Sequence, residues 1–327
     1  MNSHGKITAW PFLVGFVLVL AVGLALPMVA NRGLVFVAGV VMIDIVVALA
    51  FNFLLSTAGI LSFGQAMFII VGGYGAGIVI KTFTGLSVLP AVAAAGLLSG
   101  LLALIVGFIA LRRVEGSYFA VLTLALSTLV YLSIGKIDLL GREDGLTGIG
   151  RPDLQLGFMS VSLTAGDRFY YLIVIVCMIL TAIVWLVMKS QFGRAVRAIR
   201  HDPQRAAFFG INVQAFRLTA FVFAGTITGI ASALLGPWTQ VLTTDLGHWA
   251  QSTEPILHVL LGGAGFFWGP AVGAVAFAAL AYLTRTLTGL SELVTGGLLL
   301  FVVLAFPGGL LGIVSRMMGR TPEGHDK

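Results

Sequence analysis

Apolar segments of about 20 residues recur along the whole chain, and this feature restricts the fold more than any other. Only 10% of the 327 residues are charged, whereas a soluble domain carries about 25%. In lipid, backbone polar groups can be satisfied only in helices or closed barrels, and apolar runs of this length fit helices. The sequence therefore predicts an all-α, polytopic transmembrane helical bundle.

The pattern predicts seven continuous spans and one interrupted region. A glycine-rich break from Gly262 to Pro270 divides the interrupted region into a short span, a turn and a second span to about Arg285. We expect a broken or re-entrant segment near 254–285 and a last span over about 292–313, which gives about ten crossings in total. The first apolar segment is read as a retained helix rather than a signal peptide. The continuous spans are expected near 11–30, 34–55, 60–80, 88–110, 117–137, 169–188 and 216–235.

The distribution of Lys and Arg predicts the orientation, because cytoplasmic loops carry an excess of both. With the loop 189–215 in the cytoplasm and ten crossings, 12 of the 19 basic residues and both termini lie inside. Counting 254–285 as one crossing would put the basic tail outside. The other long loop, 138–168, is then external. The net charge of +6 is explained by topology, so no nucleic-acid partner is expected.

The sequence lacks the motifs of common catalytic sites. No GxxxxGK[ST] phosphate loop is present, because Gly5-Lys6 and Gly135-Lys136 are each followed by Ile. No HExxH, CxxC or nucleophile-elbow pattern is found, and the five His residues lack metal-ligand spacing. We therefore expect no enzyme activity, no catalytic residue, no metal site and no cofactor in this chain.

Polar residues at membrane depth are candidates for a translocation pathway. Asp44 lies in the middle of the second span, where a charge costs about 3 kcal/mol or more on insertion scales. It is either a pathway residue or a structural hydrogen-bonding group. Asn52, Gln65 and the helix-breaking Gly263 are the further pathway candidates, although tight helix packing also explains glycines.

Two more polar residues mark the start of the interrupted region. Glu254 stands just before Pro255, so it is read as a helix cap or as the partner of an arginine. His258 follows one turn later and is read as a packing residue. The small-xxx-small pairs Gly73/Gly77, Gly96/Gly100, Gly225/Gly229 and Gly269/Gly273 are read as helix contacts.

The loop 189–215 combines basic and apolar residues at helical spacing. Arg194, Arg197 and Arg200 recur every three residues and share one helix face. Asp202-Pro203 is typical of a helix start, and Gly210 of a helix end. Such a helix either docks into another protein or lies on the membrane surface as a basic amphipathic anchor.

Five blocks in order resemble the permeases of branched-chain amino acid ABC importers, most of all the longer, LivM-type member of each permease pair. The loop block FGRAVRAIRHDPQRAAFFGIN resembles their coupling loop, although the importer motif EAAxxxG is only approximated by Arg205-Ala206-Ala207, with Gly210 one residue early. The resemblance covers about residues 40 to 312. The other blocks are ALAFNFLLSTAGILSFGQAMFIIVGGYGA (48–76), RRVEGSYFAVLTLALS (112–127), DGLTGIG (144–150) and LLGGAGFFWGPAVGA (260–274), followed by FPGGLLG (306–312).

The resemblance implies a single transmembrane permease domain over 1–327 in the bacterial inner membrane. Its partners would be a second homologous permease or a second copy, two cytoplasmic ABC ATPase subunits that bind the ATP, and a periplasmic or extracellular substrate-binding protein. Asp144 in the external loop would meet that binding protein. Coupling to the ATPase would involve Arg197, Arg200, Asp202, Arg205, Ala206, Ala207 and Gly210.

The implied substrates are branched-chain or related hydrophobic amino acids. Permeases for urea or amides and for aromatic acids resemble these closely, so both remain alternatives. A secondary transporter that uses Asp44 for ion coupling is a further alternative, although no repeated halves are found. A membrane scaffold would need neither Asp44 nor a docking helix.

Overall fold

Long apolar helices dominate the computed structural model, which describes residues 9–83, 85–114, 116–156, 159–164, 166–284, 296–297, 300 and 308–317. Seven stretches in this part are long and apolar enough to cross a membrane, and they confirm the seven predicted continuous spans. They contain α1 (Ala9–Val29), α2 (Arg32–Asn52) with the π-helix η1 (Phe53–Ala58), α3 (Gln65–Thr82), α4 (Val88–Arg113), α5 (Ser117–Ile134), α6 (Gly166–Lys189), and α9 (Val213–Ser232) with α10 (Leu235–Thr239).

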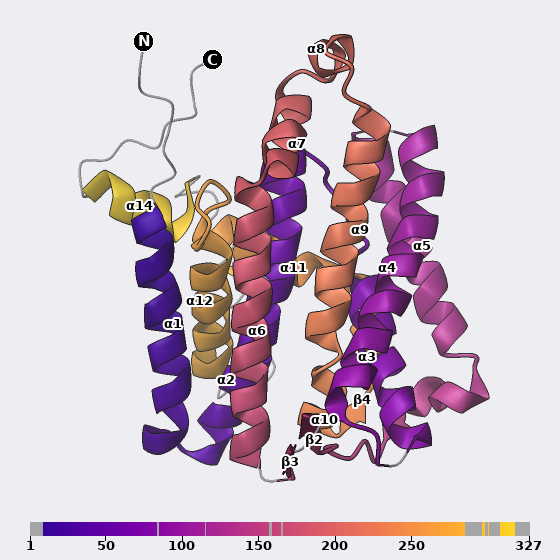
Figure 1. The fold of residues 1–327 in the computed structure, drawn as a ribbon, viewed down its shortest axis with the longest axis vertical. Coiled ribbons are helices and arrows are strands. Elements are labelled where there is room, and N and C mark those ends of the chain that lie inside the picture. Colours follow the sequence, from indigo (N-terminus) through magenta and orange to yellow (C-terminus); the bar gives the residue numbers. More distant parts are fainter. Residues whose placement is uncertain are drawn as a thin grey trace.

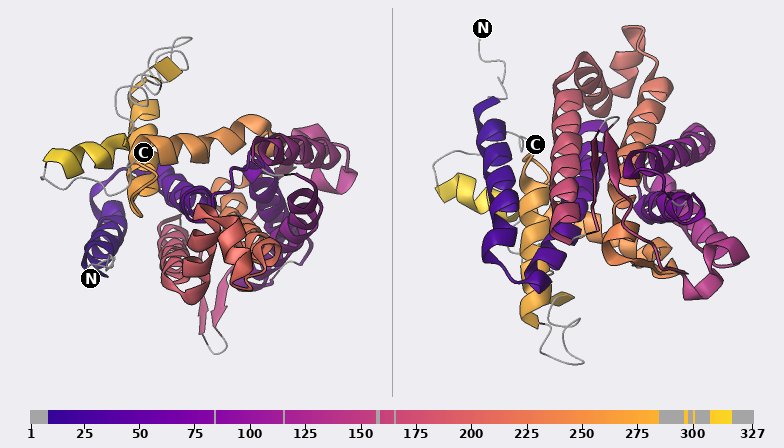
Figure 2. Two further views of the ribbon diagram at one scale, coloured as in Figure 1. Left: turned by 90° about the horizontal axis from the view of Figure 1, so that it is seen from above. Right: turned by 60° about the horizontal axis from the view of Figure 1, so that its bottom comes forward.

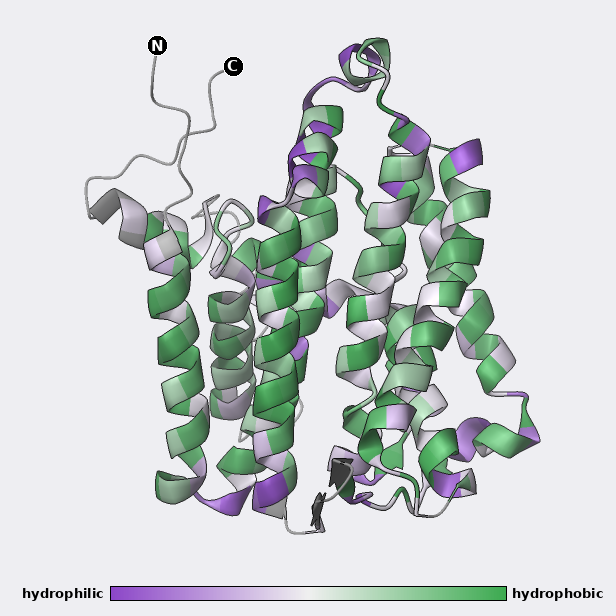
Figure 3. Cartoon of the chain, in the orientation of Figure 1, coloured by the Kyte–Doolittle hydropathy of each residue, from purple (hydrophilic) through white to green (hydrophobic). Residues whose placement is uncertain are grey.

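The helices stand side by side and share an apolar middle. Figure 3 shows hydrophobic residues along the helix lengths and hydrophilic residues gathered mainly at the two ends. At one end lie α7 (Gln191–His201) and α8 (Pro203–Phe208), together with the start of α1 and with α14 (Gly309–Met317) (Figure 1). We call this the α8 end. The opposite end, which carries the strands, is called the strand end.

Short strands occupy the strand end, which the prediction of an all-α bundle did not include. β1 (Leu146–Thr147) pairs antiparallel with β4 (Val241–Leu242), and β2 (Leu154–Leu156) pairs antiparallel with β3 (Met159–Val161). These strands and the 3₁₀ helices η2 (Asp138–Leu140), η3 (Arg142–Asp144) and η4 (Thr244–Gly247) lie in connections between spans. Each sheet has only two strands, so the bundle remains helical in class.

The interrupted region forms two helices joined by a glycine-rich turn at the predicted break, but the first helix does not form the short span that was expected. Seen from above, α11 (Trp249–Gly262) runs across the bundle, and α12 (Gly269–Thr284) follows the direction of the spans (Figures 1 and 2). A Cβ on Gly273 would lie 1.8 Å from the His258 carbonyl oxygen, so the two backbones are in direct contact. The predicted last span over 292–313 falls largely outside the described residues. The number of ten crossings therefore stays a prediction.

Small residues also bring α9 close to both α3 and α4. A Cβ on Gly229 would lie 2.2 Å from the Ser99 hydroxyl oxygen, and one on Gly72 would lie 2.4 Å from the Gly229 carbonyl oxygen. The predicted Gly225/Gly229 pair is thus a helix contact. On α3, Gly72 rather than Gly73 makes the close backbone approach, because the nearest atom to a Cβ on Gly73 is 3.6 Å away.

Candidate functional site

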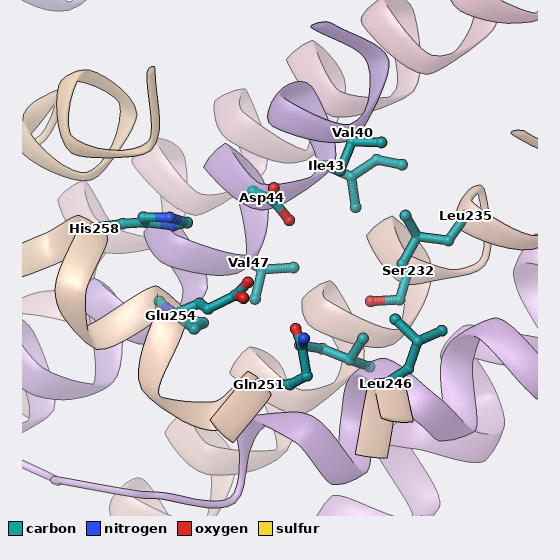
Figure 4. Close-up of a pocket in the computed structure, with 12 residues that line it drawn as sticks. Val40, Ile43, Asp44, Val47, Ser232, Leu235, Leu246, Gln251, Glu254 and His258 are labelled. Carbon is teal, nitrogen blue, oxygen red and sulfur yellow. The ribbon is translucent and has the colours of Figure 1, made fainter. Parts of the chain in front are cut away.

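A cavity of about 260 Å³ lies between α2, α3, α9, α10, η4 and α11. Its volume lies just below the range of about 300–1,000 Å³ for small-molecule sites. Most of its wall is aliphatic, with polar groups contributed by α2, α9 and α11 (Figure 4). The lining residues are Val40, Ile43, Asp44, Val47, Ile69, Ser232, Leu235, Leu246, Gln251, Glu254, Pro255 and His258.

Asp44, predicted as a pathway residue, points into this cavity. It lies 12 positions after the first residue of α2, which is about 18 Å along the helix and near the middle of a membrane. Figure 4 shows the carboxyl groups of Asp44 and Glu254 directed toward the same space. Among the described residues, neither carboxyl group has a hydrogen-bond or ion-pair partner from another side chain.

Glu254 does not have the role that its sequence position indicated. The helix begins at Trp249 and is capped by His248, so Glu254 lies inside α11 and is not its cap. No arginine pairs with it in the described part of the chain. The side chain of Glu254 instead lines the cavity.

The cavity contains three further polar residues that sequence reasoning did not assign to a pathway. Ser232 lies at the end of α9, and its hydroxyl donates to the Thr228 carbonyl at 2.8 Å. Gln251 lies one turn before Glu254 on α11. His258 is 3% exposed, contacts the ring of Phe277, and has a buried Nδ1 without a hydrogen-bond partner in the described structure. The interpretation of His258 as a packing residue accounts for its contact with Phe277 but not for its place in the cavity lining.

The other predicted pathway residues lie outside the cavity lining. Asn52 is buried two turns beyond Asp44 at the start of η1, and Gln65 is buried at the start of α3, where Thr228 donates to it at 3.3 Å. Gly263 ends α11 with a φ of +108°, a left-handed conformation that favours glycine. Its position beside Gly308 explains it as a turn residue, and the structure does not bring it to Asp44.

The loop 189–215 folds into two short helices with capped starts. Ser190 caps α7 by accepting from the Gly193 amide at 3.2 Å. Asp202 caps α8 by accepting from the Arg205 amide at 2.9 Å, and Pro203 occupies the first helical turn. Each cap of this kind contributes about 1 kcal/mol. Gly210 follows α8 with a φ of +81°, as its predicted place at a helix end requires.

Three arginines of the predicted coupling set are engaged within the chain. Arg197 donates to the Met188 carbonyl at 2.8 Å; burial lowers the pKa of this guanidinium, and the nearby charge of Arg194 lowers it further. Arg200 donates to the main-chain carbonyl of Ser56 in η1. Arg205 forms an exposed ion pair with Asp202 at 2.8 Å. The first two contacts hold α7 against the ends of α6 and α2.

The most prominent residues of α8 and its end were not predicted. Phe208 is 91% exposed and Phe209 is 86% exposed, and α8 itself projects beyond the ends of the spans (Figure 1). Ala206 is buried against the loop, whereas Ala207 is exposed beside the two rings. An exposed aromatic pair of this kind marks an interaction surface rather than a folded core. The signal for it in the sequence was an apolar dipeptide directly before a terminating glycine.

The external-loop candidate Asp144 lies at the strand end, two positions before β1 and away from α8. It is the last residue of η3 and is exposed. The same loop is tied to the bundle by Arg151, which donates to the carbonyls of Pro237 and Trp238 at 3.2 and 3.4 Å. Asp144 is therefore presented from a fixed position.

A membrane-spanning helical bundle with carboxyl groups facing a cavity at membrane depth is typical of a membrane transport protein. Comparison with known families makes this specific: residues 33–303 match the family model described as "Branched-chain amino acid transport system / permease component". The chain belongs to this family and is a permease subunit of an ABC importer. It is accordingly a multi-pass protein of the bacterial inner membrane. These findings confirm the resemblance seen in the sequence.

Relatives of two kinds align with the chain. It is 26% identical over 312 residues to the high-affinity branched-chain amino acid transport system permease protein LivM of Salmonella typhimurium, covering 89% of this chain and 73% of the relative. It is 27% identical to LivM of Escherichia coli, covering 92% and 74%. It is 26% identical to the LivH permease protein of Escherichia coli, covering 58% and 64%. No solved structure matches the chain. The existence of paired relatives implies a permease partner.

Proposed function

We propose that this chain forms, together with a second homologous permease, the translocation pathway for branched-chain or related hydrophobic amino acids. ATP hydrolysis on two cytoplasmic ATPase subunits drives the transport, and this chain binds no cofactor of its own. A substrate-binding protein delivers the solute at the outer face. The observation that carries the proposal is the contact of the α7–α8 loop with η1, which continues directly into the helix that bears Asp44.

The shape of α8 supports docking on an ATPase. Its six residues project beyond the spans. The exposed rings of Phe208 and Phe209 offer an aromatic surface that can fill a cleft in another protein. Arg197 and Arg200, which the sequence placed among the coupling residues, act in this proposal as links between α7 and the bundle. Ala207 and the two rings form the contact itself.

The arrangement of the two ends supports a cytoplasmic α8 end. Arg112 and Arg113 end α4, and Arg112 lines a surface hollow together with Asn212, which caps α9 directly after α8. Basic residues therefore gather at the α8 end, as the positive-inside rule requires of a cytoplasmic face. The start of α1 and α14 lie at this end as well, which favours cytoplasmic termini. Asp144 and the strands then face the periplasm, where the binding protein docks.

The substrate class rests on two independent supports. The LivM and LivH relatives are named as branched-chain amino acid permeases. The cavity offers aliphatic walls from Val40, Ile43 and Val47 together with a few polar groups, which suits a small solute with an apolar side chain.

The test is reconstitution of the chain in proteoliposomes with its partner permease, the ATPases and the binding protein. Uptake of labelled leucine should require ATP and should stop when the catalytic glutamate of the ATPase is replaced by glutamine. A proton uncoupler should leave initial uptake unchanged. Uptake that continues with the inactive ATPase but is abolished by the uncoupler would contradict the proposal and would favour a secondary transporter.

A further inference from the structure

We propose that Asp44 and Glu254 form a subsite that binds the ammonium group of the translocated solute. The inference rests on the proposed function, because it names the chemistry by which the same cavity recognises an amino acid. It assigns a role to Glu254, which the sequence alone did not place in the pathway. It also separates amino acids and amines from aromatic acids, which carry a carboxylate without an ammonium group.

The first observation is the charge of the cavity wall. Two carboxyl groups from different helices point into one space of about 260 Å³ (Figure 4). The described lining contains no Lys or Arg. Ionised carboxylates accept hydrogen bonds and donate none, so two of them can both be paired by one group that has several donors. An ammonium group has three donors and one positive charge and can therefore pair with both.

The second observation is the absence of internal partners. In the described part of the chain, neither Asp44 nor Glu254 takes part in an ion pair. The cost of placing a charge at membrane depth is high unless a partner or a cavity compensates it. The described part of the bundle supplies no cation to these two groups, so a cationic group in the cavity would compensate their charge.

The third observation is the unpartnered ring of His258. It is 3% exposed, lines the cavity one turn after Glu254, and its buried Nδ1 has no hydrogen-bond partner in the described structure. Buried polar atoms are rarely left unsatisfied in native proteins. His258 lines the cavity, so a polar solute held there is a candidate partner for this ring and would make it a third polar contact of the wall.

The aliphatic part of the wall indicates where the rest of the solute lies. Val40, Ile43 and Val47 line the cavity from α2, the same helix as Asp44, and Leu235 and Leu246 line it from α10 and η4. A solute whose ammonium group binds the carboxylates thus has apolar surface available for a branched side chain. A solute carboxylate would instead be repelled by Asp44 and Glu254 if it entered this subsite.

The test measures binding to the complete transporter in lipid nanodiscs without the binding protein, so that the selectivity of that protein does not contribute. Saturation-transfer NMR titrations would compare leucine, 3-methylbutylamine, which lacks the carboxylate, and 4-methylpentanoate, which lacks the ammonium group. We expect leucine and the amine to bind, and 4-methylpentanoate to bind at least about tenfold more weakly, because charge-assisted hydrogen bonds are lost.

Matched variants locate the effect. The isosteric double variant Asp44→Asn with Glu254→Gln should raise the Kd of leucine and of the amine at least about tenfold. Asp245→Asn is the control, because it makes one substitution of the same kind at an exposed residue of η4 outside the cavity lining. Asp44→Glu retains the charge and should keep the preference for the amine over 4-methylpentanoate, which also shows that a variant at this position still folds.

Three results would overturn the subsite. They are equal binding of amine and 4-methylpentanoate, an unchanged Kd in the double variant, and displacement of the amine by sodium ions alone at millimolar concentration. The same nanodisc preparation, supplied with the binding protein, is assayed in parallel for leucine-dependent ATP hydrolysis. If leucine stimulates ATP hydrolysis but the titrations show no preference for the amine over 4-methylpentanoate, the subsite is rejected and the proposed importer function stands. Absence of the response rejects the proposed function itself.

Discussion

The guanidinium of Arg200 in α7 donates a hydrogen bond to the main-chain carbonyl of Ser56 in η1. The aliphatic part of the same side chain covers Gly59, where a Cβ would lie 2.7 Å from the Arg200 Cγ. η1 is a π-helix that continues α2 without a break, and α2 carries Asp44. A displacement of α7 is therefore passed to the helix that forms one wall of the cavity. π-Helical turns of this kind are frequent at functional sites.

Replacement of Arg200 tests this link. Arg200→Ala removes both the hydrogen bond and the cover over Gly59, so we expect the ATPase to hydrolyse ATP with little transport. Uptake per ATP hydrolysed should fall at least about fivefold, the lower range of typical coupling energies. The measurement is the ratio of leucine uptake to phosphate release in proteoliposomes. Arg194→Ala is the control, because Arg194 is an exposed arginine of the same helix that donates to the Lys189 carbonyl at the end of α6; a similar loss in both variants would contradict a specific link.

The exposed rings of Phe208 and Phe209 should anchor the ATPase. Changing both to Ser removes the aromatic contact without disturbing the bundle, because neither side chain is buried. We expect the affinity for the ATPase in detergent to fall at least about 30-fold, as for the loss of an interface hot spot. Gln204→Ala, an exposed residue of the same helix, should leave the affinity unchanged. Normal affinity of the double variant would remove α8 from the interface.

A charge introduced at Ala207 should block docking by repulsion and desolvation rather than by loss of the aromatic contact. Ala207 is exposed beside the two rings, so Ala207→Glu should insert into the membrane normally and abolish uptake. Ala198→Glu places the same charge on an exposed position of α7 and should retain most of the uptake. Membrane content is followed by quantitative immunoblotting and uptake by labelled leucine. Full uptake by the Ala207 variant would show that this face of α8 has no partner.

Two adjacent glycines of α3 should differ in their effect on stability. A Cβ on Gly72 would lie 2.4 Å from the Gly229 carbonyl oxygen, whereas the nearest atom to a Cβ on Gly73 is 3.6 Å away. Gly72→Ala must push α3 from α9 and should cost about 1–3 kcal/mol, the range for overpacking. Gly73→Ala should be tolerated. Thermal unfolding in detergent compares the two; equal melting temperatures would contradict the close contact of α3 and α9.

The sequence was sufficient for features that depend on local order. The seven continuous spans follow from apolar runs, and the start of α8 follows from Asp202-Pro203, because a cap and its helix are neighbours in the chain. Asp44 was identified because an isolated charge in an apolar run is conspicuous.

Features that depend on packing between distant segments were not predictable. Gln251 and Glu254 reach the cavity only because α11 runs across the bundle and meets α2 about 200 positions earlier in the chain. No periodicity in the sequence of α11 indicates that this helix runs across the bundle. In the same way, Phe208 and Phe209 are apolar and would be expected to be buried, but they are exposed because α8 lies beyond the spans. The strands of the strand end were missed because pairings of two or three residues have no repeating pattern.

Accessibility of the cavity during the ATP cycle tests the central claim, that this cavity belongs to an ATP-driven pathway. Gln251→Cys places a thiol on the cavity wall, and Cys177→Ala removes the native cysteine, which is buried. A membrane-impermeant maleimide is applied to one side of proteoliposomes that contain the complete transporter, in the nucleotide-free state and trapped with ATP and vanadate. The account predicts that the side from which the introduced thiol is labelled differs between the two states. Labelling from the same side at the same rate in both states would contradict it.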